Sequence, residues 1–370
     1  MLLFPIIVLC GSKIISRLSC MTAKLNPVRL LARLFKPREE HRIHHESAKT
    51  KPTVGLLSSS DTASITYLLR PYLSKLGQRG VIIDTETGVA EDGLPATYNC
   101  VVIVRYLPSE WVQPLQEFRA SGGRVIYFMD DDLMDPLALK NLPASYEKKI
   151  RKFAVHQRTK LESICDEFWV STQYLAEKYY KWRPTLLLPG ASIGDIAVEG
   201  NMCSICYHGT ASHKAELEWL VSIFSSVQRG NDETRVEVFG DHQVNRMYRQ
   251  IPRVAVLHPM SWPSYLAYTS AIKHDIGLAP LLPDPFNAAR GPTKFFDFAR
   301  MGAVGIYSNV APYRDFIQDG VDGILLPNEP ELWVETILDL SLDTQRRQRM
   351  RAAARERAQS MTWDGPLKGV

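Results

Sequence analysis

Short apolar runs alternate with longer amphipathic stretches along the chain from Thr53 onward. Runs rich in Val, Ile, Leu and aromatic residues are typical of buried strands, whereas apolar residues spaced three or four apart predict helices. Strands that alternate with helices in this way are the signature of parallel βαβ units. The sequence therefore predicts an α/β fold built on parallel sheets.

The predicted elements form two series. The strands of the first series are Val54–Leu57, Gly80–Ile83, Cys100–Val104, Arg124–Phe128, Phe168–Val170 and Thr185–Leu188. Those of the second are Ser204–Tyr207, Val236–Phe239, Val254–Leu257, Asp275–Ala279, Val304–Tyr307 and Ile324–Leu326. The predicted helices are Ala63–Leu76, Trp111–Ala120, Ala144–Cys165, Ala215–Val227, Trp262–Ala271, Phe295–Met301, Glu329–Leu340 and Thr344–Gln359. Two such series predict two Rossmann-like domains, whose ligands bind at the carboxyl ends of the strands.

The expected domain boundaries follow from where each series begins and ends. Residues 1–50 precede the first strand and form a basic leader. The first Rossmann-like domain takes residues 51–190 and the second takes residues 195–350, joined by the linker LPGASIG at 188–194. Residues 351–370 form a C-terminal helix and tail.

Composition is that of an ordinary globular protein. The chain has 370 residues, 45% hydrophobic and 23% charged, enough for two cores of normal domain size. Its formal net charge of +4 suits an anionic small substrate and gives no reason to expect a nucleic-acid partner. No Gly-x-Gly-x-x-Gly follows a predicted strand and no Walker loop is present, which disfavours a dinucleotide oxidoreductase or a P-loop enzyme.

The cysteines predict no metal or redox site. The six of them mostly lie inside apolar runs, a pattern typical of reduced, buried thiols in a cytosolic protein. Cys203 and Cys206 lie in one predicted strand, where their sulfurs need not converge, and no second Cys or His pair has zinc-site spacing. A cytoplasmic location is therefore expected.

The leader allows two interpretations. Met1–Leu9 is apolar but too short to span a bilayer, and no basic residue precedes it as in a signal peptide. From Pro27 to Arg38 the chain alternates Leu and Phe with Arg and Lys at helical spacing. Such a basic amphipathic helix can rest on an anionic membrane at its inner face, whereas the alternative is a flexible basic leader.

The most informative stretch runs from Pro285 to Leu326. Its loop AARGPTK, at 288–294, leads into the apolar helix Phe295–Met301. A helix start that follows Gly and Pro presents unpaired N–H groups and a positive dipole end, which suit a phosphate group. Asp297 is expected in the first turn, where its carboxylate can accept hydrogen bonds from sugar hydroxyls. A buried strand and the turn DGVDG, at 319–323, complete the stretch.

This succession resembles the donor half of the group-1 (family four, retaining) glycosyltransferases. In that family a helix carrying a lysine and an acid is followed by a Gly-x-Pro-Val strand and a Glu-x-x-x-Asp-Gly-x-x-Gly turn. The resemblance is clearest from Cys203 to Trp363. It implies the GT-B fold, with an acceptor domain (51–190) facing a nucleotide-sugar donor domain (195–350) across a cleft, and with the last helix and Trp363 crossing back to the first domain.

The resemblance also implies a donor site. Gly209, His213 and Lys214 follow a predicted strand where the family binds the donor diphosphate, and Thr293 and Lys294 lie at the helix start. The arginine that the family carries directly after the glycine is Thr210 here. Phosphate binding is therefore expected to depend more on the two lysines.

The family's pair of acidic residues is incomplete in this chain. Asp297 matches the second member, which contacts the nucleotide ribose, but the first falls on Ala289. Asn287 or Asp284 can substitute for it if the loop is rearranged. The departures at Ala289 and Thr210 keep open a catalytically silent GT-B protein that acts as a binding or scaffold partner.

Asp130, Asp131 and Asp132 follow a predicted strand and form the most conspicuous acidic cluster. An Asp-x-Asp pair can hold Mg²⁺ and a diphosphate. Asp130 and Asp132 also resemble the nucleophile pair of haloacid-dehalogenase phosphatases, which would make the protein a Mg²⁺-dependent phosphohydrolase. The cluster can instead cap a helix. We favour a further interpretation, in which Asp130 and Asp132 are catalytic groups that position acceptor hydroxyls at the cleft.

Ser59 and Ser60 follow the first strand and are candidate acceptor-binding residues, with Arg70, Arg105 and Tyr106 as further cleft-edge candidates. The resulting hypothesis is a glycosyltransferase of cell-surface polysaccharide or glycan synthesis. It moves a sugar, with retention, from a nucleotide-diphosphate donor to a carbohydrate or lipid-linked acceptor. Because cationic groups can stabilise the leaving diphosphate, neither a metal nor another cofactor is expected.

Overall fold

Two parallel β-sheets organise the structure, a computed structural model that describes residues 53–88, 93–95, 97–194, 202–209 and 213–361. The predicted leader helix at 27–38, Thr210 and Trp363 lie outside the described residues. Contacts join residues 51–370 into one unit, so the domain boundaries given above stay a prediction. In the described part of the chain, no helix combines the length and hydrophobicity needed to cross a membrane.

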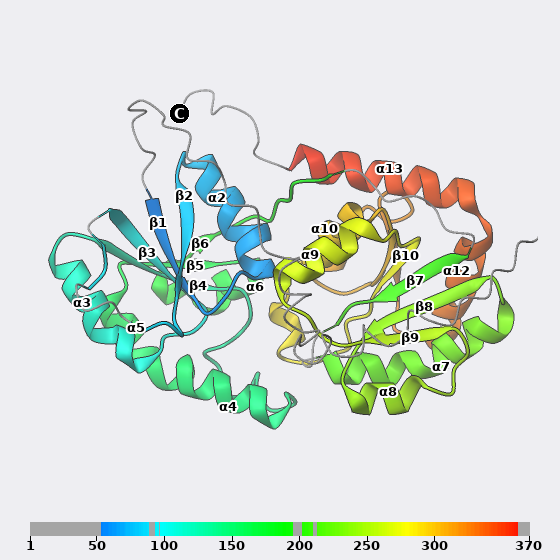
Figure 1. Cartoon of the computed structure of the whole chain (residues 1–370), viewed down its shortest axis with the longest axis horizontal. Coiled ribbons are helices and arrows are strands. Elements are labelled where there is room, and N and C mark those ends of the chain that lie inside the picture. Colours follow the sequence, from blue (N-terminus) through cyan, green and yellow to red (C-terminus); the bar gives the residue numbers. More distant parts are fainter. Residues whose placement is uncertain (1–52, 89–92, 96, 195–201, 210–212, 362–370) are drawn as a thin grey trace, which may run out of the picture. The chain divides into compact units, whose positions relative to one another are not determined.

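The first sheet has six parallel strands in the order β2-β1-β3-β4-β5-β6 (Figure 1). They are β1 (Thr53–Ser58), β2 (Arg79–Asp84), β3 (Tyr98–Val104), β4 (Arg124–Met129), β5 (Glu167–Val170) and β6 (Thr185–Leu186). The strand order reverses between β1 and β3. In open α/β sheets such a point is where loops part at the carboxyl ends and leave room for a ligand.

The second sheet has six parallel strands in the order β12-β11-β10-β7-β8-β9 (Figure 1). They are β7 (Cys203–Tyr207), β8 (Thr234–Phe239), β9 (Val254–Leu257), β10 (Ile276–Ala279), β11 (Val304–Ser308) and β12 (Ile324–Leu326). Counted from β7, this is the 3-2-1-4-5-6 order of the Rossmann fold, which reverses between β7 and β10. All twelve predicted strands are confirmed.

Helices and single turns connect the strands. In the first half they are η1 (Ile65–Leu69), α2 (Arg70–Lys75), η2 (Ser109–Trp111), α3 (Val112–Ala120), α4 (Ala144–Phe153), η3 (Val155–Gln157), α5 (Arg158–Ile164), α6 (Gln173–Lys178) and η4 (Tyr180–Trp182). In the second half they are α7 (Lys214–Gly230), α8 (His242–Tyr248), α9 (Trp262–Ala271), η6 (Asn287–Ala289), α10 (Thr293–Met301), α11 (Tyr313–Phe316), α12 (Pro330–Leu342) and α13 (Thr344–Ser360).

Two of the predicted helices are interrupted, and three short helices were not predicted. The stretch 144–165 breaks at Ala154, whose φ of −128° and ψ of −65° end α4. The stretch 63–76 contains a π-helical turn, η1, near its start. The short helices α6, α8 and α11 span seven residues or fewer. Such lengths carry too little hydrophobic periodicity to be recognised in a sequence.

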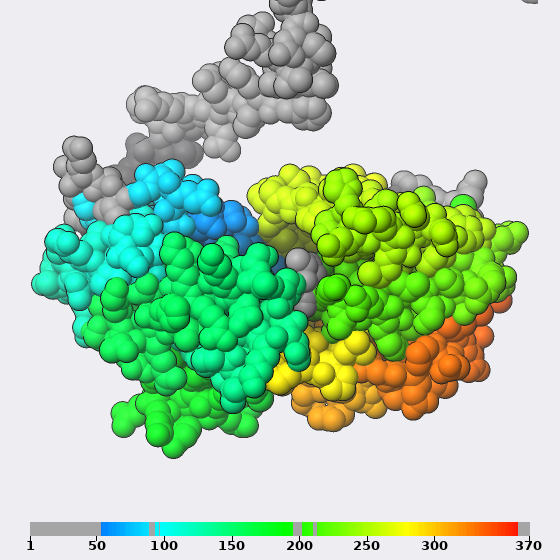
Figure 2. All heavy atoms as spheres, turned by 90° about the horizontal axis from the view of Figure 1, so that it is seen from below, coloured from blue at the N-terminus to red at the C-terminus, as the bar shows by residue number. Residues whose placement is uncertain are grey.

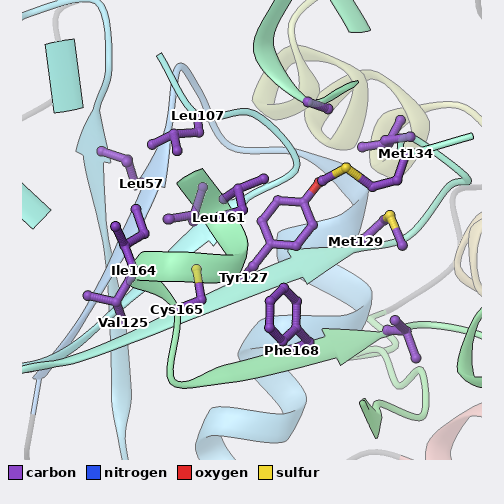
Figure 3. Packing of buried hydrophobic residues seen from close by; sticks show 14 of the residues in the cluster. Leu57, Leu107, Val125, Tyr127, Met129, Met134, Leu161, Ile164, Cys165 and Phe168 are labelled. Carbon is purple, nitrogen blue, oxygen red and sulfur yellow. The ribbon is translucent and has the colours of Figure 1, made fainter. Parts of the chain in front are cut away.

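Both faces of the first sheet are buried. Val125 and Tyr127 of β4 point to one face, where they pack with Leu161 of α5 (Figure 3). Ile126 and Phe128 point to the other face and join a second cluster. A parallel sheet covered on both faces requires apolar residues at consecutive positions. This explains why continuous apolar runs, and not alternation, identified the strands.

Helix α10 is anchored by its aromatic residues. Phe295, Phe296 and Phe298 are almost completely buried in a cluster that also contains Ala354 and Ala358 of α13. The small side chains of α13 let the two helices approach closely, and contacts between α10 and α13 follow from this packing. The helix that begins at the candidate phosphate site is therefore held on its apolar side by the core.

Because α10 packs closely on β10, we expect a larger residue at Gly277 to be destabilising. A Cβ atom at this position would lie 2.4 Å from Cδ1 of Phe298. We expect Gly277→Ala to lower the free energy of unfolding by about 1–3 kcal/mol, because overpacking a core forces neighbouring side chains from their rotamers. Gly194→Ala is the control, since a Cβ there would meet no atom within 4 Å. Equal denaturation midpoints for the two variants would contradict the prediction.

Candidate functional site

The candidate site begins where α10 starts, beside the carboxyl ends of β7 and β10. Lys294 donates from Nζ to the main-chain oxygen of His208, which directly follows β7, over 2.6 Å. The same Nζ lies 3.2 Å from Oδ2 of Asp297. The side chain of Lys294 remains 24% exposed. This arrangement places a partly accessible cation at the amino end of a helix, where an anion is favoured.

Asp297 occupies a more buried position than the sequence suggested. Because α10 starts at Thr293, Asp297 is its fifth residue and lies beyond the first turn, which contains no acidic residue. Its Oδ1 accepts a 2.6 Å hydrogen bond from the Tyr67 hydroxyl and lies 3.6 Å from Arg300. Burial acts to raise the pKa of Asp297, but the charges of Lys294 and Arg300 outweigh it and hold that pKa below its usual value.

The other predicted donor residues separate into two groups. Lys214 is 64% exposed and pairs with Glu218 on the surface of α7, at 3.4 Å. His213 is half-buried, with Nδ1 3.6 Å from Oε2 of Glu216. Oε1 of Glu216 accepts a hydrogen bond of 2.8 Å from the amide of Asn287. Asn287 and His213 thus meet at one buried carboxylate, whereas Lys214 points elsewhere.

Three further candidate residues lie just beyond the ends of β7 and β1. Gly209 permits the local chain to pack, because a Cβ atom there would lie 2.8 Å from the ring of Tyr207. Ser59 and Ser60 are exposed beyond β1. The hydroxyl of their neighbour Ser58 donates to the Ser60 carbonyl oxygen at 2.8 Å. The hydroxyls of Ser59 and Ser60 are thus accessible to solvent.

The three consecutive aspartates do not act as one cluster. Asp130 accepts a short hydrogen bond from Ser64 and lies 3.3 Å from Arg105. Asp132 is fully buried on another side, where it binds Lys178 at 2.6 Å and Tyr179 at 2.5 Å. Burial raises the pKa of Asp130. The carboxylates of Asp130 and Asp132 therefore have different partners, and no helix starts directly after them among the described residues.

Arg105 links Asp130 and Asp131, but not Asp132, and adopts an unusual backbone conformation. It follows β3 with φ of 68°, in the left-handed region that non-glycine residues seldom occupy. Its guanidinium lies 2.7 Å from Asp131 and donates to the Tyr146 hydroxyl over 2.8 Å. Such backbone strain, of order 1–3 kcal/mol, is found preferentially at functional sites.

Arg290 connects the two halves of the site, a role that the sequence analysis missed. Its guanidinium lies 3.5 Å from Oδ1 of Asp131 and rests over the Phe286 ring. Burial acts to raise the pKa of Asp131, but Arg290 and Arg105 hold it below its usual range. A nearby contact joins Asn141 to Asp284 over 2.6 Å. Figure 2 shows the same junction, where yellow atoms of the second half lie against green atoms of the first.

A small cavity of about 50 Å³ lies at this junction. It is lined by Leu68, Asp130, Asp131, Ser171, Pro189, Arg290, Gly291, Pro292 and Thr293. Ligand pockets for small molecules usually measure about 300–1,000 Å³. At about 50 Å³, this cavity is smaller than a nucleotide sugar.

Comparison with solved structures identifies the fold. Sucrose-phosphate synthase from Thermosynechococcus elongatus has a TM-score of 0.55 at 14% identity, covering 84% of this chain and 95% of that one. HepE from Anabaena, solved with UDP and glucose, has a TM-score of 0.54 at 12% identity, with the same coverage. These are GT-B glycosyltransferases. The chain has the GT-B fold.

A third GT-B structure is longer than this chain. TarM from S. aureus, solved with UDP, has a TM-score of 0.51 at 9% identity over 70% of this chain, which spans only 53% of TarM. No model of a known protein family matches the sequence, and no curated protein does. The GT-B fold predicted from the sequence is confirmed.

Proposed function

We propose that this GT-B protein is a glycosyltransferase that moves a sugar, with retention, from a nucleotide-diphosphate donor to a carbohydrate or lipid-linked acceptor. One observation carries the proposal. Lys294 and the start of α10 lie at the carboxyl ends of β7 and β10, the point where the strand order reverses. Ligands of open α/β sheets bind at this position, and a helix amino end favours phosphate.

On the donor side of the proposed reaction, the protein stabilises the negative charge of the leaving diphosphate. The leaving diphosphate gains negative charge as the sugar departs, and fixed cations stabilise that charge without solvent reorganisation. Lys294 supplies one cation, and the Arg290 loop supplies the second in place of the exposed Lys214. Asp297 holds Lys294 in position, and it can reach a ribose hydroxyl only by exchanging its Tyr67 or Lys294 contact. Two such cations make a metal unnecessary for this step.

The acceptor side of the reaction is assigned to Asp130, which Arg105 holds from 3.3 Å away. Asp130 is hydrogen-bonded to Ser64 and lines the cavity opposite Arg290. We assign Asp130 to orienting the acceptor hydroxyl, whose attack comes from the face that the diphosphate leaves. Asp132, whose oxygens are occupied by Lys178 and Tyr179, is assigned a structural role instead.

The expected setting is the cytoplasm, with residues 1–50 contacting an anionic membrane.

A thermal-shift screen tests the proposal most directly. HepE was solved with UDP and glucose and TarM with UDP, so uridine nucleotides come first, followed by GDP, ADP, CMP and their sugar conjugates. We expect one nucleotide family to raise Tm with or without EDTA, since a ligand that binds only the folded state stabilises it. UDP release with an acceptor then measures transfer. Binding without transfer would favour the silent scaffold, and no shift with any nucleotide would overturn the proposal.

A further inference from the structure

Three side chains able to bind a metal converge beneath the donor site. Cys206 lies in β7, His208 directly follows it, and His274 precedes β10. Each offers one ligand atom, and these atoms all lie within 4.8 Å of one another. All three residues are buried, with exposed fractions of 0%, 5% and 1%. The parallel pairing of β7 with β10 brings His274 to the other two across a long sequence separation.

A single carboxylate organises the two imidazoles. Oε1 of Glu237, on β8, lies 2.9 Å from Nε2 of His208 and 3.1 Å from Nε2 of His274. Tyr268 donates a short hydrogen bond to the other oxygen of Glu237. An ionised carboxylate only accepts hydrogen bonds, so both imidazoles carry their proton on Nε2. A histidine that binds a metal usually donates one ring N–H to a carboxylate and binds the metal through its other, unprotonated ring nitrogen.

His274 is left with an unexplained nitrogen. Its Nδ1 is buried and has no hydrogen-bond partner among the described residues. A buried polar atom without a partner has lost its hydration and gained no hydrogen bond in return. The corresponding nitrogen of His208 contacts the Tyr265 hydroxyl at 3.1 Å. A cation held by the Cys206 sulfur and the two histidines would give this nitrogen of His274 a partner, and at His208 it would replace the contact with Tyr265.

We propose that Cys206, His208 and His274 bind a thiophilic divalent cation, of which Zn²⁺ is the prototype. Thiolate and imidazole are the ligands that favour Zn²⁺ over Mg²⁺ or Ca²⁺. Three protein ligands leave the fourth position of a tetrahedral ion to a water molecule. Binding converts the Cys206 thiol to a thiolate and releases one proton to solvent, so affinity falls as the pH is lowered.

The position of this site gives the ion a structural role. The main-chain oxygen of His208 accepts the hydrogen bond of Lys294. An ion that fixes His208 therefore fixes the acceptor that holds the proposed phosphate-binding lysine. The ion takes no part in sugar transfer, and its presence does not depend on the proposed function being correct.

Metal content and cobalt substitution test the site in the full chain, with any histidine tag removed. We expect mass spectrometry to find one equivalent of Zn²⁺ per chain. Replacement by Co²⁺ should give a thiolate-to-cobalt charge-transfer band in the near ultraviolet. Cys206→Ser should abolish the band and lower zinc affinity at least about tenfold. Cys203→Ser is the matched control, since Cys203 lies on the same strand and packs in a different cluster.

The wild-type protein alone can overturn the proposal. Folded protein that takes up no stoichiometric Zn²⁺ and shows no thiolate band with Co²⁺ has no such site. A band that persists in Cys206→Ser, or that disappears equally in Cys203→Ser, would also overturn it. Should Cys206→Ser fail to fold, His274→Gln provides a second variant, for which lower zinc affinity with an unchanged circular dichroism spectrum is expected.

Discussion

Replacing Lys294 with alanine should lower kcat for sugar transfer by about 10²-fold to 10³-fold. The expected loss is that of one preorganised group facing the charge that develops in the transition state. Lys294 is partly exposed at the helix start, and its Nζ needs only to shift from the His208 oxygen to meet a phosphate. Initial rates of nucleoside diphosphate release, measured at several donor concentrations, separate the effects on kcat and KM.

Two lysine variants make this result interpretable. Lys160→Ala, on the exposed side of α5, should leave the rate within about twofold of wild type, as surface substitutions usually do. Lys214→Ala distinguishes the structure from the sequence prediction. The structure places Lys214 in a surface pair with Glu218, so a small effect is expected. If Lys214→Ala abolishes transfer while Lys294→Ala does not, the assignment of the phosphate site is wrong.

The features that could be predicted, the strands and the start of α10, are each encoded in a short stretch of sequence. Each strand is a continuous apolar run because both faces of its sheet are covered, and such runs are visible in any window of sequence. The start of α10 was located for a similar reason, since Gly291 and Pro292 directly precede it. The helix begins two residues earlier than expected, which moves Asp297 out of the first turn.

Contacts between distant segments could not be read from the sequence. The pairing of Arg290 with Asp131 joins residues from different sheets, and no local spacing encodes it. Asp131 and Asp132 are neighbours in sequence, yet Asp132 pairs with Lys178 and Asp131 pairs with Arg290. The Cys206 cluster was missed because zinc-site spacing was sought along the chain, whereas His274 reaches it only through the pairing of β10 with β7.

Asp297→Ala should lower the free energy of unfolding by about 3–5 kcal/mol at neutral pH, the usual cost of removing one partner from a buried ion pair. Arg300 is only 9% exposed and loses its carboxylate partner, although it keeps its 2.6 Å hydrogen bond to Thr269. The Tyr67 hydroxyl loses an acceptor as well. Urea unfolding of wild type and variant measures the difference. Asp297→Asn, which keeps an acceptor for Tyr67, should cost less.

The pH dependence of that difference separates the charge of Asp297 from its packing. The pKa of Asp297 is held below its usual value in the folded protein, so its charge contributes stability above the unfolded value of about 4. This contribution is lost as the pH falls through the folded pKa. The difference between wild type and Asp297→Asn should therefore be constant near neutrality and shrink in acid. A difference that stays constant below pH 4 would mean that hydrogen bonding and packing, and not charge, make Asp297 stabilising.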